Sequence, residues 1–347
     1  MKKVVTLIVL CLLIIPVYVC AKSSMNEDLE KDDPTHLLPK RIIAGFLDVR
    51  TPGSTSRVNI NRAKNDGYNV IVIAYGEVYS TDLGFYTSSP TSVQTIIDKI
   101  RQAKEAGMKV LLAVGGIPNT FHPGVNKTDI SPKVFGKDMT DGQINVLANN
   151  IVSFLHKNSI DGIVYSFRKF TSPDFINQLS LDIKKIDPKI IIVAEPQVND
   201  YKLVTTGKSN DYDKVIQNGY IDYLFIQEYD TYPEYEPGFI ADSYSKIVND
   251  LHIPIHTKIL IGEPTNAISG GTNTIYHPEG NATLSLTTEQ AVELMLPQFE
   301  KLKFKPRFAG VTGWSLNTDY AADLYGDSSH NSGVFAKNLS KCIYGNA

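Results

Sequence analysis

Carboxylate, amide and phenol side chains stand where short β-rich runs of the sequence end. Glu77 and Glu195 follow two such runs, and Gln227 and Tyr229 close a third. A carboxyl group can act as a general acid when its pKa lies near the working pH, so Glu77 and Glu195 are candidate proton donors. Gln227 and Tyr229 are two residues apart, which places them on one face of a strand, whereas Glu228 points to the other face.

Several other chemistries are not supported by the spacing of the residues. The histidines are scattered without H-x-x-x-H or C-x-x-C patterns, so no metal centre is predicted. The chain has no G-x-S-x-G elbow, no G-x-G-x-x-G after the first β-rich run and no phosphate-binding G-x-x-x-x-G-K-[ST] loop, and we expect no cofactor. With 34 Lys and Arg against 37 Asp and Glu, the 347-residue chain has a formal charge of −3, which argues against nucleic acid as a partner.

Eight β-rich runs must position these groups. Several of them are almost entirely apolar, which is typical of parallel strands buried on both faces. The predicted strands are Ile42–Leu47, Val70–Tyr75, Val110–Val114, Ile163–Phe167, Ile190–Ala194, Tyr223–Tyr229, Ile259–Ile261 and Phe308–Trp314.

Amphipathic helices are predicted between the strands. Gly107 is expected to stop one helix and Asp141 to cap another, and the predicted helices are Ser92–Ala106, Asp141–Lys157, Pro173–Ile186, Tyr244–Leu251, Thr288–Lys303 and Val334–Ile343. Eight strand–helix units favour one (β/α)8 TIM barrel with no large inserted domain, and a doubly wound open sheet is the alternative. In such a barrel the chemistry belongs at the carboxyl ends of the strands.

The first 40 residues are expected to lie outside the barrel. Two lysines, an apolar run and Val19-Cys20-Ala21 read as a signal peptide cleaved near Ala21, which predicts a secreted or periplasmic protein without a membrane span in the mature chain. A permanent anchor and a lipid on Cys20 are alternatives. Residues 22–40 read as a polar tether and 41–347 as the barrel. Only Cys342 remains after cleavage, so no internal disulfide is expected.

Four segments resemble strands of the family-18 glycoside hydrolases, the chitinases and their relatives. The stretch from Ile160 to Arg168, I-D-G-I-V-Y-S-F-R, is similar from Asp161 onward to the D-G-x-D-x-D-x-E signature of the fourth strand. The third, sixth and eighth strands of the family are matched by K-V-L-L-A-V-G-G at 109–116, F-I-Q-E-Y-D at 225–230 and G-V-T-G-W-S at 310–315. The resemblance covers most of residues 41–341.

The signature departs from the family at the positions that do the chemistry. In active members its final Glu protonates the leaving oxygen, and the preceding Asp orients the acetamide of the substrate. Here those positions are Arg168 and Ser166, and the other inner Asp is Val164. A guanidinium titrates above about 12 and cannot act as the acid. Asp161, the outermost acid, reads as a turn and strand-entry residue.

A further departure is Ala113, which replaces a third-strand Ser that in the family hydrogen-bonds a signature Asp. Since donor and acceptor are lost together, no buried polar group is left unsatisfied. We expect Ala113 and Val164 to pack together inside the barrel.

The resemblance implies a sugar-binding role for several residues. Trp314 matches the tryptophan that floors the central subsite, with a plain core aromatic as the alternative. Gln227 and Tyr229 match a pair that touches the acetamide, and Asp230 is a hydrogen-bonding candidate. Arg168 is expected to contact a ligand or to pair with a carboxylate such as Glu195 or Asp230.

The segment from Gly262 to Arg307 is too short for the small inserted domain of some members, so a shallow groove is expected. Tyr232, Tyr235 and Tyr276 either line that groove or decorate its loops.

Three functions remain open. The first is a non-hydrolytic chitinase-like pseudoenzyme that binds a chitin-like or N-acetylglucosamine-containing glycan. The second is a chitinase-like or endo-N-acetylglucosaminidase-like hydrolase that uses a displaced acid such as Glu195. The third is a surface or storage protein with a vestigial groove.

Overall fold

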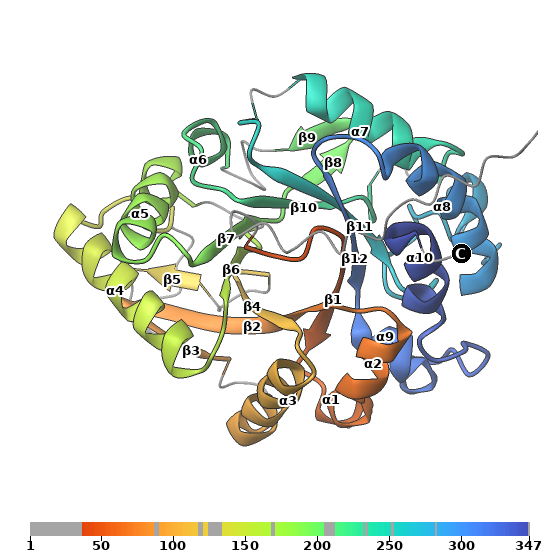
Figure 1. The fold of residues 1–347 in the computed structure, drawn as a ribbon, viewed down its shortest axis with the longest axis horizontal. Coiled ribbons are helices and arrows are strands. Elements are labelled where there is room, and N and C mark those ends of the chain that lie inside the picture. Colours follow the sequence, from red (N-terminus) through yellow and green to blue (C-terminus); the bar gives the residue numbers. More distant parts are fainter. Residues whose placement is uncertain are drawn as a thin grey trace, which may run out of the picture. The chain divides into compact units, whose positions relative to one another are not determined.

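The eight predicted strands form a closed parallel barrel. The computed structural model describes residues 37–86, 90–116, 121–123, 134–167, 171–204, 212–231, 233, 235–250, 253–281 and 283–345. Neighbouring strands pair in parallel around the ring, and β12 pairs with β1 to close it (Figure 1). The predicted (β/α)8 barrel is confirmed. Its strands are β1 (Ile42–Asp48), β2 (Val70–Ser80), β4 (Lys109–Val114), β6 (Gly162–Tyr165), β7 (Ile191–Ala194), β10 (Tyr223–Gln227), β11 (Lys258–Pro264) and β12 (Phe308–Trp314).

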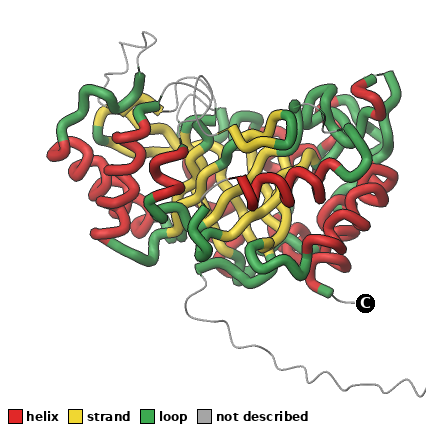
Figure 2. Tube along the Cα trace, turned by 90° about the horizontal axis from the view of Figure 1, so that it is seen from above, coloured by secondary structure: helices red, strands yellow, loops and turns green. Residues whose placement is uncertain are grey.

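Helices surround the strands (Figure 2). Two short helices, α1 (Pro52–Arg57) and α9 (Leu316–Tyr320), and two 3-10 turns, Pro278–Gly280 and Ala322–Tyr325, lie in the connections. The other helices are α2 (Ile60–Asp66), α3 (Val93–Glu105), α4 (Asp141–Lys157), α5 (Pro173–Ile186), α6 (Asp213–Gln217), α7 (Phe239–Asp250), α8 (Thr288–Leu302) and α10 (Val334–Tyr344).

The cap of α4 and the start of α7 differ from the sequence prediction. The cap of α4 is Thr140, whose hydroxyl accepts from the Gln143 N–H while the Gln143 side chain reaches back, so Asp141 is the first helical residue. The helix α7 begins at Phe239, five residues before the expected Tyr244.

Apolar side chains are packed on both the inner and the outer face of the barrel strands. One buried cluster lies inside the barrel and includes Val72, Ala113, Val164 and Phe225. A second, larger cluster packs the outer face of the strands against the helices. Burial on both faces explains why the strands read as continuous apolar runs.

Four short strands extend the carboxyl ends of the barrel. The hairpin partner of β2 is β3 (Asp82–Phe85), and β5 (Phe121–Pro123) pairs with the far end of β2. A second hairpin joins β8 (Gln197–Asn199) to β9 (Lys202–Val204), and β8 also pairs with β10. These strands of three or four residues were not predicted, because they are too short to show a period.

Asp161 lies at the opposite end of the barrel and has structural partners. Its carboxylate accepts from the Lys104 ammonium at 2.7 Å, from Lys109 at 3.4 Å and from the Val110 N–H at 2.8 Å. The prediction of a strand-entry role is confirmed, since these bonds tie β4 and α3 to the start of β6.

The predicted signal peptide and nearly all of the tether lie outside the described residues, and both remain predictions. Within the described part of the chain, no helix is long and apolar enough to cross a membrane. Cys342 is a buried free thiol on α10.

Candidate functional site

A cleft of about 240 Å³ opens at the carboxyl ends of β1, β2, β10 and β12. It contains four of the predicted ligand-binding residues together with residues that the sequence did not single out. Its lining consists of Arg50, Tyr75, Gly116, Gln227, Tyr229, Asp230, Ser269, Gly270, Gly271 and Trp314.

Trp314 forms part of the wall of this cleft. It is the last residue of β12, and its ring lies 5.6 Å from the Phe46 ring and 6.3 Å from the Tyr75 ring, measured between centroids. These two rings hold the indole in place, and the side chain of Trp314 remains partly exposed. Trp314 therefore offers an aromatic surface to the cleft.

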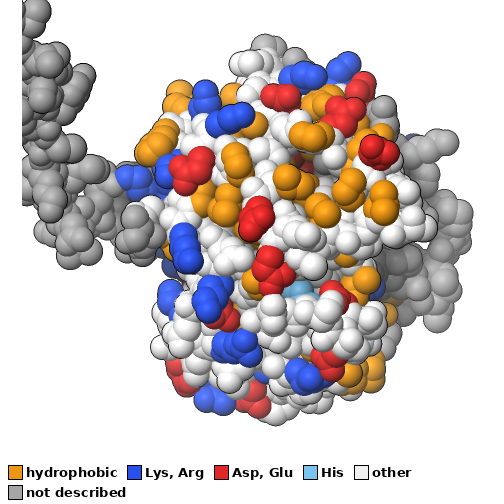
Figure 3. Space-filling view, turned by 90° about the vertical axis from the view of Figure 1, so that its right-hand side faces the viewer, with side chains coloured by type: hydrophobic (Ala, Val, Ile, Leu, Met, Phe, Trp, Pro, Cys, Tyr) orange, Lys and Arg blue, Asp and Glu red, His pale blue; other side chains and the backbone are white. Residues whose placement is uncertain are grey.

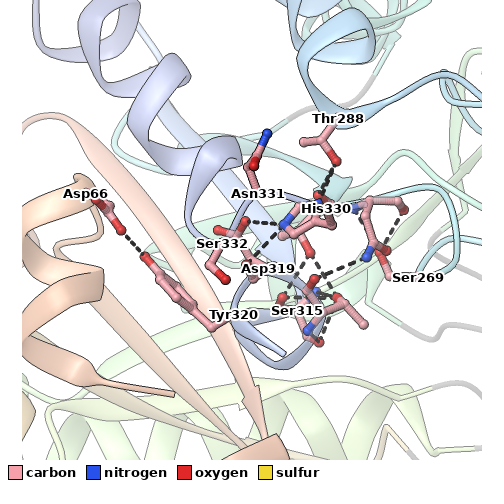
Figure 4. A network of polar contacts seen from close by, with 12 residues as sticks. Asp66, Ser269, Thr288, Ser315, Asp319, Tyr320, His330, Asn331 and Ser332 are labelled. Carbon is pink, nitrogen blue, oxygen red and sulfur yellow. Dashed lines mark hydrogen bonds and ion pairs between the residues drawn. The ribbon is translucent and has the colours of Figure 1, made fainter. Parts of the chain in front are cut away.

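The chain after Trp314 is held by a buried polar network (Figure 4). The hydroxyl of Ser315 caps α9, and Thr265 donates to the Ser315 carbonyl at 2.9 Å. Further along α9, Asp319 accepts from His330 at 3.1 Å and from the Tyr68 hydroxyl at 2.9 Å. Tyr320 donates to Asp66 at the end of α2, and His330 bonds to Thr288 at the start of α8, so the segment that carries Trp314 is fixed on several sides.

The residues at the end of β10 alternate as predicted. Gln227 and Tyr229 line the cleft, whereas Glu228 points outward and accepts from the Ser243 hydroxyl of α7 at 2.5 Å. Glu228 is fully buried, and this burial raises the pKa of its carboxyl group well above the ordinary value, although the Ser243 bond opposes the shift. It therefore belongs to the layer between barrel and helices and not to the cleft.

Asp230 is positioned by an unusual turn. Its φ of 57° lies in the left-handed region, and its N–H donates to the Asn273 carbonyl at 3.0 Å. Gly271 comes so close that a Cβ there would lie 2.8 Å from a carboxylate oxygen of Asp230. Glycine at 271 thus lets the loop approach the carboxylate.

Arg50 is a cleft residue that the sequence analysis missed. Its guanidinium forms a two-pronged ion pair with Asp48, at 2.8 Å through Nε and 2.6 Å through one terminal nitrogen. It also lies 5.7 Å from the centre of the Tyr75 ring. Hydrogen bonding to Asp48 raises the pKa of Arg50, so a fixed positive charge borders the cleft. The sequence signal for Arg50 is its place two residues after the end of β1.

Apolar side chains meet where β6 and β4 face the inside of the barrel. Val164 and Ala113 pair in register on β6 and β4, are fully buried and belong to the same inner cluster. The predicted packing of these two residues is confirmed. Ser166 donates a short hydrogen bond to Glu195, so these two strand ends meet. Arg168 lies outside the described residues.

The remaining candidates have other positions. Glu195 is half-buried and is not among the residues that line this cleft, and neither is the buried Glu77. Both alternatives for Tyr276, lining the groove or decorating its loops, are wrong, because its ring is fully buried and its hydroxyl donates to the Pro264 carbonyl at 3.1 Å. Tyr235 is half-buried outside this cleft, and Tyr232 lies outside the described residues.

Comparison with known structures shows the same fold in several glycan-related proteins. The chain is similar to a structure assigned as chitinase A of Streptomyces coelicolor, with 17% identity and a TM-score of 0.64, over 89% of this chain and 100% of the other. A fungal endo-β-N-acetylglucosaminidase of family 18 gives 14% identity and a TM-score of 0.60, over 88% and 99%. A xylanase and α-amylase inhibitor protein from Scadoxus multiflorus gives 15% and 0.55, over 88% and 99%.

Sequence comparison identifies the family directly. No curated protein matches the chain in sequence. The family model "Glycosyl hydrolases family 18" matches residues 49–339, which is most of the chain and includes the whole ring of strands after β1. The chain therefore belongs to glycosyl hydrolase family 18 and has a chitinase-like barrel.

Proposed function

We propose that this protein binds an N-acetylglucosamine-containing glycan in the cleft at the carboxyl face of the barrel and does not hydrolyse it. The observation that carries the proposal is the gathering of Trp314, Gln227, Tyr229 and Asp230 in one cleft, beside a strand that holds Val164 where the family has an acid.

The lining residues suit an amino sugar. The face of an indole is a flat apolar surface that can pack against the C–H face of a pyranose ring. The Gln227 amide, the Tyr229 phenol and the Asp230 carboxylate together supply donors and acceptors for hydroxyl and acetamide groups. Arg50 adds donors whose charge does not depend on pH.

The residues on and after the fourth barrel strand, β6, support the absence of hydrolysis. Ser166 stands at the position of the Asp that orients the acetamide, and Val164, at the other inner Asp position, is fully buried beside Ala113. Ser166 uses its hydroxyl to donate to Glu195. The sequence places Arg168 at the acid position, and a guanidinium cannot release a proton near neutral pH.

Titration calorimetry with chito-oligosaccharides, combined with mass spectrometry of the mixture, tests both halves of the proposal. The protein should bind and release no product. Trp314→Ala should weaken binding by about 2 kcal/mol, close to 30-fold, as for a buried aromatic anchor. Phe304→Ala is the matched control, because this exposed ring lies at the other end of the barrel. No binding of any acetamido sugar would favour a vestigial groove and protein contacts.

A second candidate is a hydrolase with a displaced acid. The hydrogen bond between Ser166 and Glu195 favours it, since it brings a carboxylate against the signature strand. Proton transfer requires placement to within a fraction of an ångström, and Glu195 does not match the position of the family's acid. Product release that is abolished by Glu195→Gln would establish this function in place of ours.

Export stays a proposal as well. The amino-terminal sequence supports a secreted or periplasmic location, where such a glycan would be encountered. Detection of a chain beginning near Lys22 in the external or periplasmic fraction would support it, and an uncleaved cytosolic chain would contradict it.

A further inference from the structure

Three segments at the amino ends of the strands form a surface of one charge sign. Residues 37–41, 253–258 and 303–308 contain six Lys and Arg and no Asp or Glu, although the whole chain has a formal charge of −3. We call this surface the basic face. Its cations are Lys40, Arg41, Lys258, Lys303, Lys305 and Arg307.

The three segments are bonded to one another, so their charges act together. Arg41 donates to the Phe308 carbonyl at 3.0 Å, and Arg307 donates to the Pro254 carbonyl at 2.6 Å. The ammonium of Lys258 lies 3.4 Å from the Pro306 carbonyl. A shallow hollow of about 220 Å³ lies between the segments, and Lys40, Lys258, Phe304 and Lys305 are among its lining residues.

Four of the six cations of the basic face form no ion pair with a described carboxylate. Lys303 pairs with Glu300 at 2.5 Å, but no ion pair is seen between the described carboxylates and Lys258 or Lys305. Arg41 and Arg307 bond to carbonyl groups, which leaves their charge in place. In the view onto α8 and α10, basic side chains gather along the left-hand edge, and the middle of that view is mixed in charge (Figure 3).

Two apolar side chains protrude from the same loops. Phe304 is 81% exposed and Ile255 is 85% exposed, whereas the other large apolar side chains of the described residues reach at most 53%. Phe304 follows α8 and Ile255 precedes β11, on the two loops that Arg307 ties together. Single exposed apolar residues are common, but two such prominent ones on one basic surface point to a partner that has both anionic and apolar parts.

We propose that the basic face docks on an anionic lipid bilayer. The lysines and arginines would sit against the anionic headgroups, and Phe304 and Ile255 would enter the boundary between headgroups and acyl chains. A soluble polyanion would need the charges but not the apolar pair, which is why a bilayer fits better.

The described chain enters the barrel at the basic face. Leu38 is buried there, and its N–H donates to the Tyr223 hydroxyl at 3.1 Å. The docking does not depend on glycan binding, which we assign to the opposite end of the barrel.

Vesicle co-sedimentation of the full chain tests the proposal. The probe is vesicles of phosphatidylcholine with 30% phosphatidylserine, and pure phosphatidylcholine vesicles are the reference. The ratio of the two affinities measures selectivity for anionic lipid. Lys258→Ala combined with Lys305→Ala should lower this ratio about 30-fold, because each basic residue near an anionic surface contributes roughly a fivefold gain.

Matched variants separate the basic face from other causes of binding. Lys137→Ala with Lys202→Ala removes the same charge from exposed sites at the other end of the barrel and should leave the ratio unchanged. Phe304→Ser with Ile255→Ser should weaken vesicle binding about tenfold or more and leave heparin binding unchanged. Unaltered calorimetric glycan binding and circular dichroism would show that each variant is folded.

Three results would overturn the proposal. The first is equal binding to both vesicle types. The second is an unchanged ratio in the Lys258 and Lys305 variant, which would assign any membrane binding to the amino-terminal apolar run. The third is strong heparin binding together with vesicle binding that is unchanged in the Phe304 and Ile255 variant, which would indicate a polyanion site.

Discussion

Val164→Asp tests whether the inner cluster of the barrel tolerates a carboxylate at this position. The substitution restores a residue of the family signature at a position that is now fully buried in the inner cluster. The new carboxylate would face Ala113 across β4 and β6, because the two residues pair in register. Neither side chain can donate a hydrogen bond, so we expect a large loss of stability.

The magnitude follows from burial of an ionisable group. Complete burial shifts the pKa of a carboxyl group by up to 3–5 units, and a shift of about 3 units corresponds to roughly 4 kcal/mol at pH 7. In a domain of this size, such a loss should lower Tm by roughly 10 °C. Since burial raises the folded-state pKa of the new carboxyl, the loss should be smallest below about pH 4, where only the cost of burying a neutral carboxyl remains, and should grow as the pH rises.

Thermal unfolding followed by circular dichroism between pH 4 and pH 8 measures this effect. Val146→Asp is the matched control, because Val146 lies on α4 and is 49% exposed. The Tm of this control variant should change little. Adding Ala113→Ser to Val164→Asp should recover about 1 kcal/mol through a new hydrogen bond. An unchanged Tm for Val164→Asp would refute the packing argument and would indicate that water or a polar partner reaches Val164.

Three further predictions concern polar groups elsewhere in the barrel. Burial lowers the pKa of His330, but the bonds to Asp319 outweigh it and raise the value, so stability should fall as the pH rises above about 6.5, and His330→Gln should flatten that fall. Glu228 carries a raised pKa, so Glu228→Gln should stabilise the protein by about 1 kcal/mol at pH 8 and not at pH 4. Asp161→Asn should cost about 1–3 kcal/mol of stability and leave glycan affinity unchanged.

Chemical denaturation at several pH values measures all three. A His330→Gln variant with the wild-type pH profile of stability would show that His330 does not cause the fall of stability with pH. A destabilised Glu228→Gln variant at pH 8 would mean that its carboxylate is ionised and bonded in the fold. Loss of glycan binding with Asp161→Asn would give Asp161 the chemical role that we deny it.

The ring of strands could be predicted because its signal is local and repeated. Runs such as Val70–Ile73 and Ile190–Val193 are apolar throughout, and only burial on both faces produces that pattern in a parallel sheet. The short strands of the β2–β3 and β8–β9 hairpins could not be predicted, because three or four residues carry no measurable period and their pairing depends on tertiary contacts. The early start of α7 was missed for a related reason, since Pro237 and Gly238 read as a loop.

The cleft residues at strand ends could be predicted, and those in loops that fold back toward the cleft were missed. Gln227, Tyr229 and Trp314 end their strands, so the barrel rule places them together. Arg50 and Gly271 lie in loops, and no local pattern shows that they approach Tyr75 and Asp230. Tyr276 was misjudged because the sequence does not reveal its hydrogen bond to a buried carbonyl.

The most direct test is a single mixture of the purified protein with chitotetraose, followed by calorimetry for binding and by mass spectrometry for cleavage over a day. Our account predicts saturable binding, weakened by Trp314→Ala, and an intact tetrasaccharide. Accumulation of shorter sugars with pure protein whose Arg168 has been verified would contradict it.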